Sequence, residues 1–165
     1  MASLRSLAAG LSTLGLSLAL AGCGSSPGVG PSAGVGYETV IAAVVLAESE
    51  AGGRAFELEI EDGTAQVHVA AAGREVEVDV DLAGPTVTDR RDDGDLDPDD
   101  RATMDAAPTT LADAVRVAAA AHDGDGSVGE VSLEHGADAA WKVAFTDAGD
   151  VAVSVADGTI VRSAG

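Results

Sequence analysis

The chain has 165 residues and a formal net charge of −19, from 28 acidic and 9 basic side chains. Binding to nucleic acid of any sequence needs clustered cations that displace counterions from phosphates, so this charge excludes it, and it also argues against electrostatic docking on anionic lipid heads. Aromatic residues make up only 2% of the chain, which argues against stacking platforms for bases or sugars.

The first 22 residues have the layout of a secretory signal peptide. Arg5 provides a positively charged start, and an apolar stretch runs from Leu7 to Leu20. This stretch is shorter than the roughly 20 residues that a membrane-spanning helix needs. Residues 1–22 are therefore predicted to be a leader that is removed, and not a transmembrane anchor.

The end of this leader resembles the lipobox of bacterial lipoproteins, through Leu20, Ala21, Gly22 and Cys23. The resemblance implies that the Cys23 thiol is alkylated by diacylglycerol and that the leader is cut just before it. Cys23 is the only cysteine, so a disulfide within the chain cannot account for it. The alternative is an ordinary signal peptide followed by an unrelated cysteine. We expect an extracytoplasmic protein held on the cell membrane, in the cell envelope, by its lipid, since two or three acyl chains anchor a protein stably.

Residues 23–36 follow the leader and combine the predicted lipidated cysteine with a Gly-, Ser- and Pro-rich stretch. This stretch has no hydrophobic periodicity and is predicted to be a flexible tether with a reach on the order of 20 Å. Such a tether would lift a folded domain away from the membrane surface.

Residues 37–88 are predicted to form a first unit of one helix and an antiparallel sheet. Segment 39–50 has apolar residues at i,i+4 spacing, but taken alone it also fits a buried strand. Segments 56–61, 65–69 and 75–81 alternate apolar and polar residues and are separated by turn residues, which is typical of a meander. A short fourth segment follows near residue 87.

Residues 109–165 repeat this order. Thr110 and Asp113 have the spacing of a helix capping box, and strands are predicted at 130–134, 141–145 and 151–155, followed by a short closing segment. The turn glycines of the two units correspond at an offset of 73 to 76 residues, which favours a helix over a strand for segment 39–50. Trp141 lies on the apolar side of its strand and is predicted to be a core residue.

Residues 89–108 separate the two units. Eight Asp and three Arg lie between Asp89 and Asp105, and self-repulsion predicts an extended, solvated linker. The predicted fold class is therefore α+β, with two repeats of one helix packed on a three- to four-stranded antiparallel sheet and an acidic linker between them.

Each unit ends on a turn that carries Asp, Gly and Val in that order. These residues are Asp81, Gly84 and Val87 in the first unit and Asp157, Gly158 and Val161 in the second. The turns resemble the closing Asp-x-x-Thr-Gly-x-Val of the PepSY domain family, with the Thr absent or displaced, and Trp141-Lys-Val resembles a middle strand of that family. The resemblance implies tandem PepSY domains of the peptidase-propeptide type, which are non-catalytic envelope modules proposed to bind or inhibit peptidases. The family has no defined catalytic or binding residues to carry over.

Alternating aspartates in the linker give a weak candidate metal site, formed by Asp93, Asp95, Asp97 and Asp99. They resemble the start of a calcium loop, but an EF-hand starting at Asp93 would need Gly and Glu where Pro98 and Met104 stand. The pattern keeps low-affinity binding of divalent cations by an acidic surface protein as the alternative function.

A possible partner face lies on the outward side of the first sheet. Its candidate residues are Glu57, Glu59, His68, Glu77 and Asp79. If the strands pair in sequence order, His68 lies between two acidic rows, whose charges favour its protonated form. The functional interpretation is a site for a metal or a basic peptide. The alternative is a set of solvated charges that protects the sheet from aggregation.

Enzyme motifs are absent from the sequence: it has no nucleophile elbow, no His-Glu-x-x-His, no Walker loop and no Cys–His pair. We therefore expect no enzymatic activity and no cofactor. The predicted function is a non-enzymatic, lipid-anchored envelope protein that binds peptide or protein partners and no nucleic acid. Modulation of a secreted peptidase is the form of this function that the PepSY resemblance implies.

Overall fold

The computed structural model describes residues 35–164. The predicted signal peptide, the lipobox residues Leu20 to Gly22, Cys23 and most of the predicted tether lie outside the described residues. No helix among the described residues is both long enough and apolar enough to cross a membrane.

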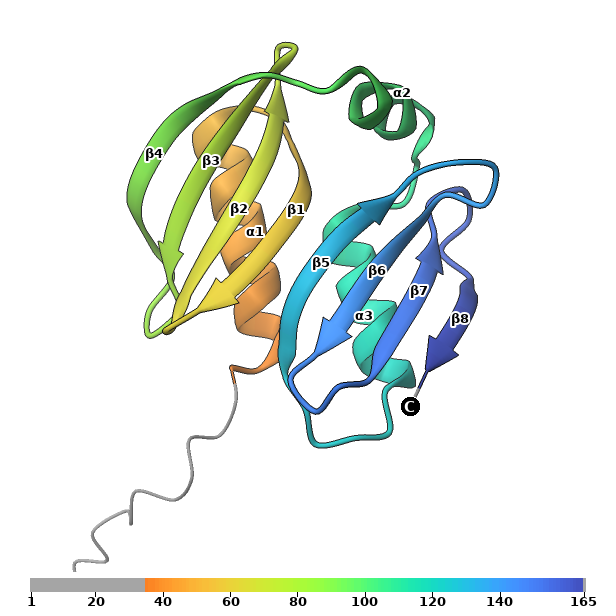
Figure 1. The fold of residues 1–165 in the computed structure, drawn as a ribbon. Helices are drawn as coiled ribbons and strands as arrows, with labels where there is room; N and C mark the ends of the chain where they lie inside the picture. The colour runs from red at the N-terminus through yellow and green to blue at the C-terminus, as the bar shows by residue number, and fades with distance from the viewer. Residues whose placement is uncertain (1–34, 165) are drawn as a thin grey trace, which may run out of the picture. The chain divides into compact units, whose positions relative to one another are not determined.

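Four strands follow the first helix and four follow the last (Figure 1). In chain order the elements are α1 (Tyr37–Ala51), β1 (Arg54–Glu61), β2 (Thr64–Ala71), β3 (Arg74–Asp81), β4 (Thr86–Asp95), α2 (Pro98–Ala106), α3 (Leu111–Ala121), β5 (Val128–Glu134), β6 (Ala140–Phe145), β7 (Asp150–Ser154) and β8 (Ile160–Ala164). Segment 39–50 is helical, as predicted, and the capping box of Thr110 and Asp113 is confirmed at the start of α3.

All eight strands belong to one antiparallel sheet with the order β4-β3-β2-β1-β5-β6-β7-β8. The predicted fold class, with two repeats that each have their own three- to four-stranded sheet, is therefore wrong. The sheet is continuous because β1 pairs with β5, where Leu58 lies opposite Val131 and Glu59 opposite Glu130. An unpaired strand edge exposes a row of N–H and C=O groups, and this pairing covers the part of both edges around these residues. The alternating pattern within a strand does not reveal which edges meet.

The structure also differs from the extended, solvated linker predicted for residues 89–108, since residues 86–95 form β4 and residues 98–106 form α2. Arginines offset the repulsion that the prediction relied on. Arg74 on β3 forms ion pairs with Asp92 and Asp95 of β4, and its hydrogen bond to Asp92 lowers the pKa of that carboxyl. With these ion pairs the acidic segment adds a fourth strand next to β3, although most of its side chains remain exposed to solvent.

Helix α2 is attached to the ends of several strands. Its first turn is capped by Asp97, whose Oδ1 accepts a hydrogen bond of 2.7 Å from the Asp99 N–H. Arg54 of β1 donates to the carbonyls of Met104 and Ala107, at 2.9 and 2.8 Å. These bonds give the carbonyls at the C-terminal end of α2 a side-chain donor and tie α2 to β1.

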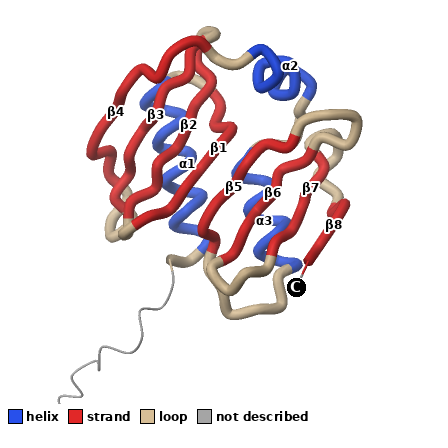
Figure 2. The backbone as a smooth tube through the Cα atoms, in the orientation of Figure 1, coloured by secondary structure: helices blue, strands red, loops and turns tan. Residues whose placement is uncertain are grey.

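The core lies between one face of the sheet and helices α1 and α3 (Figure 2). Val40 and Val44 of α1, Leu58 of β1 and Trp141 of β6 are fully buried. The Trp141 indole N–H donates to the Thr109 carbonyl at 3.1 Å, so its polar atom is satisfied inside the core. The prediction that Trp141 is a core residue is confirmed.

Candidate functional site

Helices α1 and α3 lie on one face of the sheet (Figure 1). The opposite face carries the polar residues of the alternating strands. The strand registers place these side chains in rows that cross the sheet. One row contains Glu57, His68, Glu77 and Arg91, and the next contains Glu59, Gln66, Asp79 and Asp89. The five predicted partner-face residues therefore come together on what we call the open face. Their role as a binding surface stays a prediction.

The second row continues from the first four strands into β5. Glu59 of β1 lies directly opposite Glu130 of β5, so two like charges are neighbours at the strand pair that joins the sheet. Asp79 and Asp89 are likewise direct neighbours on β3 and β4. Like charges in directly opposite positions destabilise a sheet, so the Glu59–Glu130 pair has an energetic cost that core packing does not explain, whereas Arg91 lies between Asp79 and Asp89.

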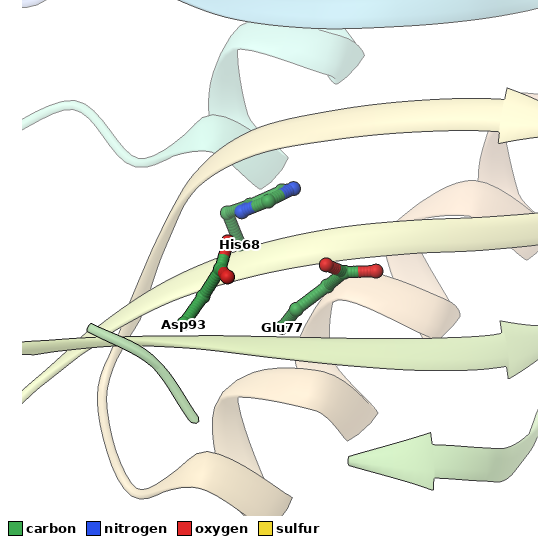
Figure 3. A group of neighbouring side chains, drawn as sticks. All are labelled: His68, Glu77 and Asp93. Atoms are coloured by element: carbon green, nitrogen blue, oxygen red, sulfur yellow. The ribbon is translucent and has the colours of Figure 1, made fainter. Parts of the chain in front are cut away.

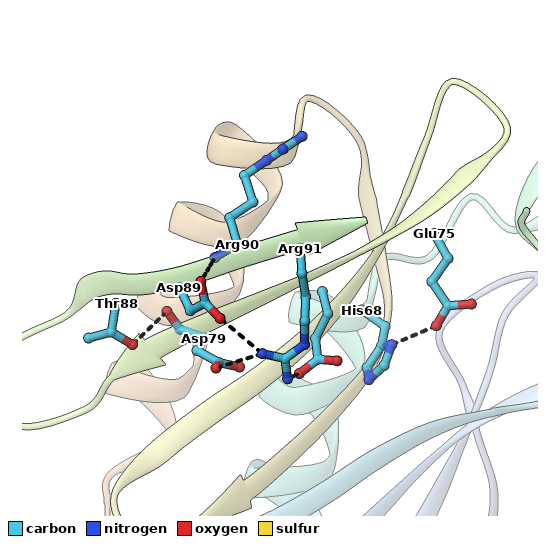
Figure 4. Close-up of polar contacts among 8 residues, drawn as sticks. His68, Glu75, Asp79, Thr88, Asp89, Arg90 and Arg91 are labelled. Carbon is cyan, nitrogen blue, oxygen red and sulfur yellow. Dashed lines mark hydrogen bonds and ion pairs between the residues drawn. The ribbon is translucent and has the colours of Figure 1, made fainter. Parts of the chain in front are cut away.

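His68 is held in one orientation by two neighbours. Its Nδ1 lies 2.6 Å from Oε1 of Glu75 (Figure 4), and the ring of Phe56 packs edge-on against it with centroids 6.1 Å apart. Phe56 sits at a β-bulge between Ala55 and Glu57, where β1 has one extra residue relative to β2. The contact with Glu75 leaves Nε2 as the ring nitrogen available to a ligand.

Arg91 is the main cation of the open face. It forms ion pairs with Glu77, with Asp79 at 3.4 Å and with Asp89 at 3.1 Å (Figure 4). Glu77 is only 7% exposed and needs this partner, because a buried carboxylate without one is costly. The other oxygen of Asp79, Oδ1, is buried and has no hydrogen-bond partner among the described residues.

The carboxyl groups near His68 interact electrostatically with one another. Burial raises the pKa of Glu57 above its usual range, and although His68 opposes the shift, the neighbouring Glu75, Glu130 and Asp100 raise it further. Burial also raises the pKa of Asp100 on α2, although His135 lies 3.1 Å from it. The two rows together hold five carboxylates, from Glu57, Glu59, Glu77, Asp79 and Asp89, against one arginine, so this part of the open face has a surplus of acidic groups.

The four alternating aspartates do not form one site. Asp95 pairs with Arg74, Asp97 caps α2, and Asp99 lies in the first turn of that helix. Asp93 is the exception, because it occupies the extra position of a β-bulge between Asp92 and Gly94, which pair with Val76 and Glu75. A bulge redirects a side chain, and here it brings the Asp93 carboxylate to the open face.

Asp93 thereby joins His68 and Glu77 (Figure 3). One potential ligand atom from each of these three residues lies within 4.8 Å of the other two. Sequence reasoning named all three as candidates but assigned Asp93 to a different site from the others. No pattern in the sequence indicates the bulge that brings Asp93 to this face, because the bulge is defined by the pairing of β3 with β4.

The second half of the open face, from β5 to β8, is different. Lys142 of β6 faces outward between Ser132 and Ala152, and Arg162 of β8 pairs with Glu134 at 2.8 Å. The remaining outward residues of β6 and β7 include several alanines. The outward charges here are Glu130, Glu134 and Asp150 against Lys142 and Arg162, so this half is nearer to charge balance than the first.

Comparisons with known proteins give little further information. No family model matches the chain, and no curated protein matches it. Among solved structures, the chain is similar to the crystal structure of a protein from Clostridium difficile 630 described as a "putative lipoprotein". The two share 18% sequence identity at a TM-score of 0.45, over 79% of this chain and 92% of that one. The PepSY resemblance stays a prediction.

Proposed function

We propose that this protein is a non-enzymatic lipoprotein of the cell envelope whose open face binds an extended cationic segment of a peptide or protein. The observation that carries the proposal is a row across five neighbouring strands with four carboxylates, Asp89, Asp79, Glu59 and Glu130, and with Gln66 at the β2 position. Arg91 lies between Asp79 and Asp89, so complementary charge on a partner would mainly relieve the repulsion between Glu59 and Glu130, and it would also steer the encounter.

The geometry of this row suggests the length of the segment. Five strands at a spacing of about 4.8 Å span roughly 19 Å, which an extended chain covers with about six residues. A segment of that length with several Lys or Arg side chains could cross the strands and place a cation near each carboxylate.

The location of the protein is proposed from the sequence. Leu20 to Cys23 resemble a lipobox, and the tether that follows would present the folded domain outside the membrane. The PepSY resemblance suggests that the cationic segment belongs to a secreted peptidase. The alternative of low-affinity cation binding by the alternating aspartates has less support, because Asp95 and Asp97 are engaged in contacts of their own.

The proposal can be tested by fluorescence anisotropy with a labelled six-residue peptide rich in Lys and Arg. The purified protein should bind it at low salt, should bind it less tightly as salt screens the charges, and should not bind a peptide with Glu in place of the cations. The variant Glu59→Gln/Asp79→Asn/Glu130→Gln should lose at least about tenfold in affinity, or about 1.4 kcal/mol.

A matched control changes the same number of charges elsewhere. Glu38, Glu50 and Asp123 are exposed and lie outside the open face, so their replacement by Gln, Gln and Asn should leave most of the affinity intact. Equal losses in both triple variants would mean that net charge alone attracts the peptide, and the proposed face would be wrong. Inhibition of a secreted peptidase by the wild type, reduced in the first variant only, would support the peptidase as partner.

A further inference from the structure

The cluster of His68, Glu77 and Asp93 joins three strands that lie side by side (Figure 3). We propose that these residues form a binding site for one divalent first-row transition-metal ion, of which zinc is the best match. The site does not depend on a cationic peptide, so it goes beyond the proposed function. It also differs from the predicted calcium-like site, because it uses only one of the four alternating aspartates.

The strongest argument is the way His68 is held. A histidine that binds a metal through one ring nitrogen commonly donates from the other to a carboxylate, which fixes the ring and its tautomer. Glu75 provides this contact at Nδ1, at 2.6 Å, and Phe56 supports the ring from its edge. In a neutral ring that donates from Nδ1 to Glu75, Nε2 carries the lone pair that a metal needs.

The two carboxylates complete a mixed set of one nitrogen and two oxygen ligands. Arg91 contacts Oε1 of Glu77, but a carboxylate offers about four lone-pair positions, so Glu77 can keep Arg91 and still bind a metal. Glu77 comes from a rigid interior strand and is almost fully buried. Asp93 is exposed and lies at the bulge, so it has the freedom to close the site.

Donor types favour zinc over calcium or magnesium. Zinc bonds of about 2.0–2.2 Å bring neighbouring ligand atoms to roughly 3.4 Å from each other, so the cluster needs to contract by at most about 1.4 Å from its present limit of 4.8 Å. An imidazole nitrogen suits zinc and its neighbours in the first row, whereas calcium and magnesium prefer oxygen ligands only. Three protein ligands would leave one coordination position open.

Isothermal titration of the full chain with ZnCl₂ tests the proposal. The wild type should bind one zinc ion, and His68→Gln should weaken binding at least about tenfold. His135→Gln is the matched control. The Nε2 of His135 also lies near a carboxylate, 3.1 Å from Oδ1 of Asp100, but among the described residues His135 belongs to no cluster of three potential metal ligands. This control should change the affinity less than about twofold.

A second pair of variants keeps the test decisive if His68→Gln fails to fold. Asp93→Asn should also weaken zinc binding at least about fivefold, whereas Asp95→Asn, on the same exposed strand, should leave it unchanged. Arg91→Gln should strengthen binding, since it removes a competing positive charge from Glu77. Calcium in hundredfold excess should not displace the zinc. Equal effects of both aspartate variants, or displacement by calcium, would show diffuse electrostatic binding and overturn the site.

Discussion

The two halves of the sheet, β1–β4 and β5–β8, bury similar faces but expose different ones. In each half, alternate residues such as Val67 and Val143 point into the core against a helix. On the open face, the first half presents acidic rows around His68 and Arg91, whereas the second presents Lys142 and an exposed Arg162–Glu134 pair. Inward residues are constrained by packing, and outward residues are not. A costly outward pattern in one half only is therefore the better indicator of function.

The largest expected effect tests whether the halves share one core. Trp141→Ala should lower the free energy of unfolding by about 3–5 kcal/mol, because it removes the largest fully buried side chain and a buried hydrogen bond. Because β1 pairs with β5, the first half should lose stability as well. Hydrogen exchange should then show reduced protection for the Val67 amide in β2, and urea unfolding should keep a single transition.

Trp141→Phe serves as the control, since it retains an aromatic ring and should cost less. Reduced protection confined to β5–β8 in Trp141→Ala would mean that the halves unfold separately, as two independent units would. Unchanged stability in both variants would contradict the burial of Trp141.

A smaller effect is expected from the arginines of the two halves. Arg91→Ala should lower the free energy of unfolding, because it leaves the carboxylate of Glu77 buried without its cation. Arg162→Ala breaks a pair whose two members are exposed, and such pairs contribute at most about 1 kcal/mol. Urea denaturation of both variants should show the larger loss for Arg91→Ala. The reverse order would mean that Glu77 is solvated and that the first half has no special charge arrangement.

How far the sequence predicts this molecule depends on the range of the interactions. Alternation of apolar and polar residues places the strands, and the Thr110–Asp113 spacing places the start of α3, because these signals act over a few residues. The pairing of β1 with β5 and the bulge at Asp93 depend on contacts between distant segments, which no local pattern encodes. Alternation within each strand is enough to place the predicted partner-face residues on one face of the sheet. It does not place Asp93 with them, because the bulge depends on how β4 pairs with β3.

The smallest effect concerns the pH dependence of the open face. The pKa of Glu57 in the folded protein lies above the value of 4.5 expected for the unfolded chain, mainly through burial and then through its acidic neighbours. The folded state therefore holds this proton more tightly than the unfolded state does. As pH rises from below 4.5 to beyond the raised pKa, ionisation of Glu57 lowers the free energy of unfolding, and the loss persists at neutral pH.

Glu57→Gln removes this ionisation, so it should stabilise the protein at pH 7 by less than about 1 kcal/mol, since solvent screens a partly exposed group. The gain should disappear near pH 4, where Glu57 is protonated in both states. Glu134→Gln in the second half should have the opposite sign at pH 7, because Glu134 has Arg162 as a partner. Thermal unfolding at the two pH values measures both differences. A gain for Glu57→Gln that is as large at pH 4 as at pH 7 would locate its cause in packing and not in the acidic surplus of the first half.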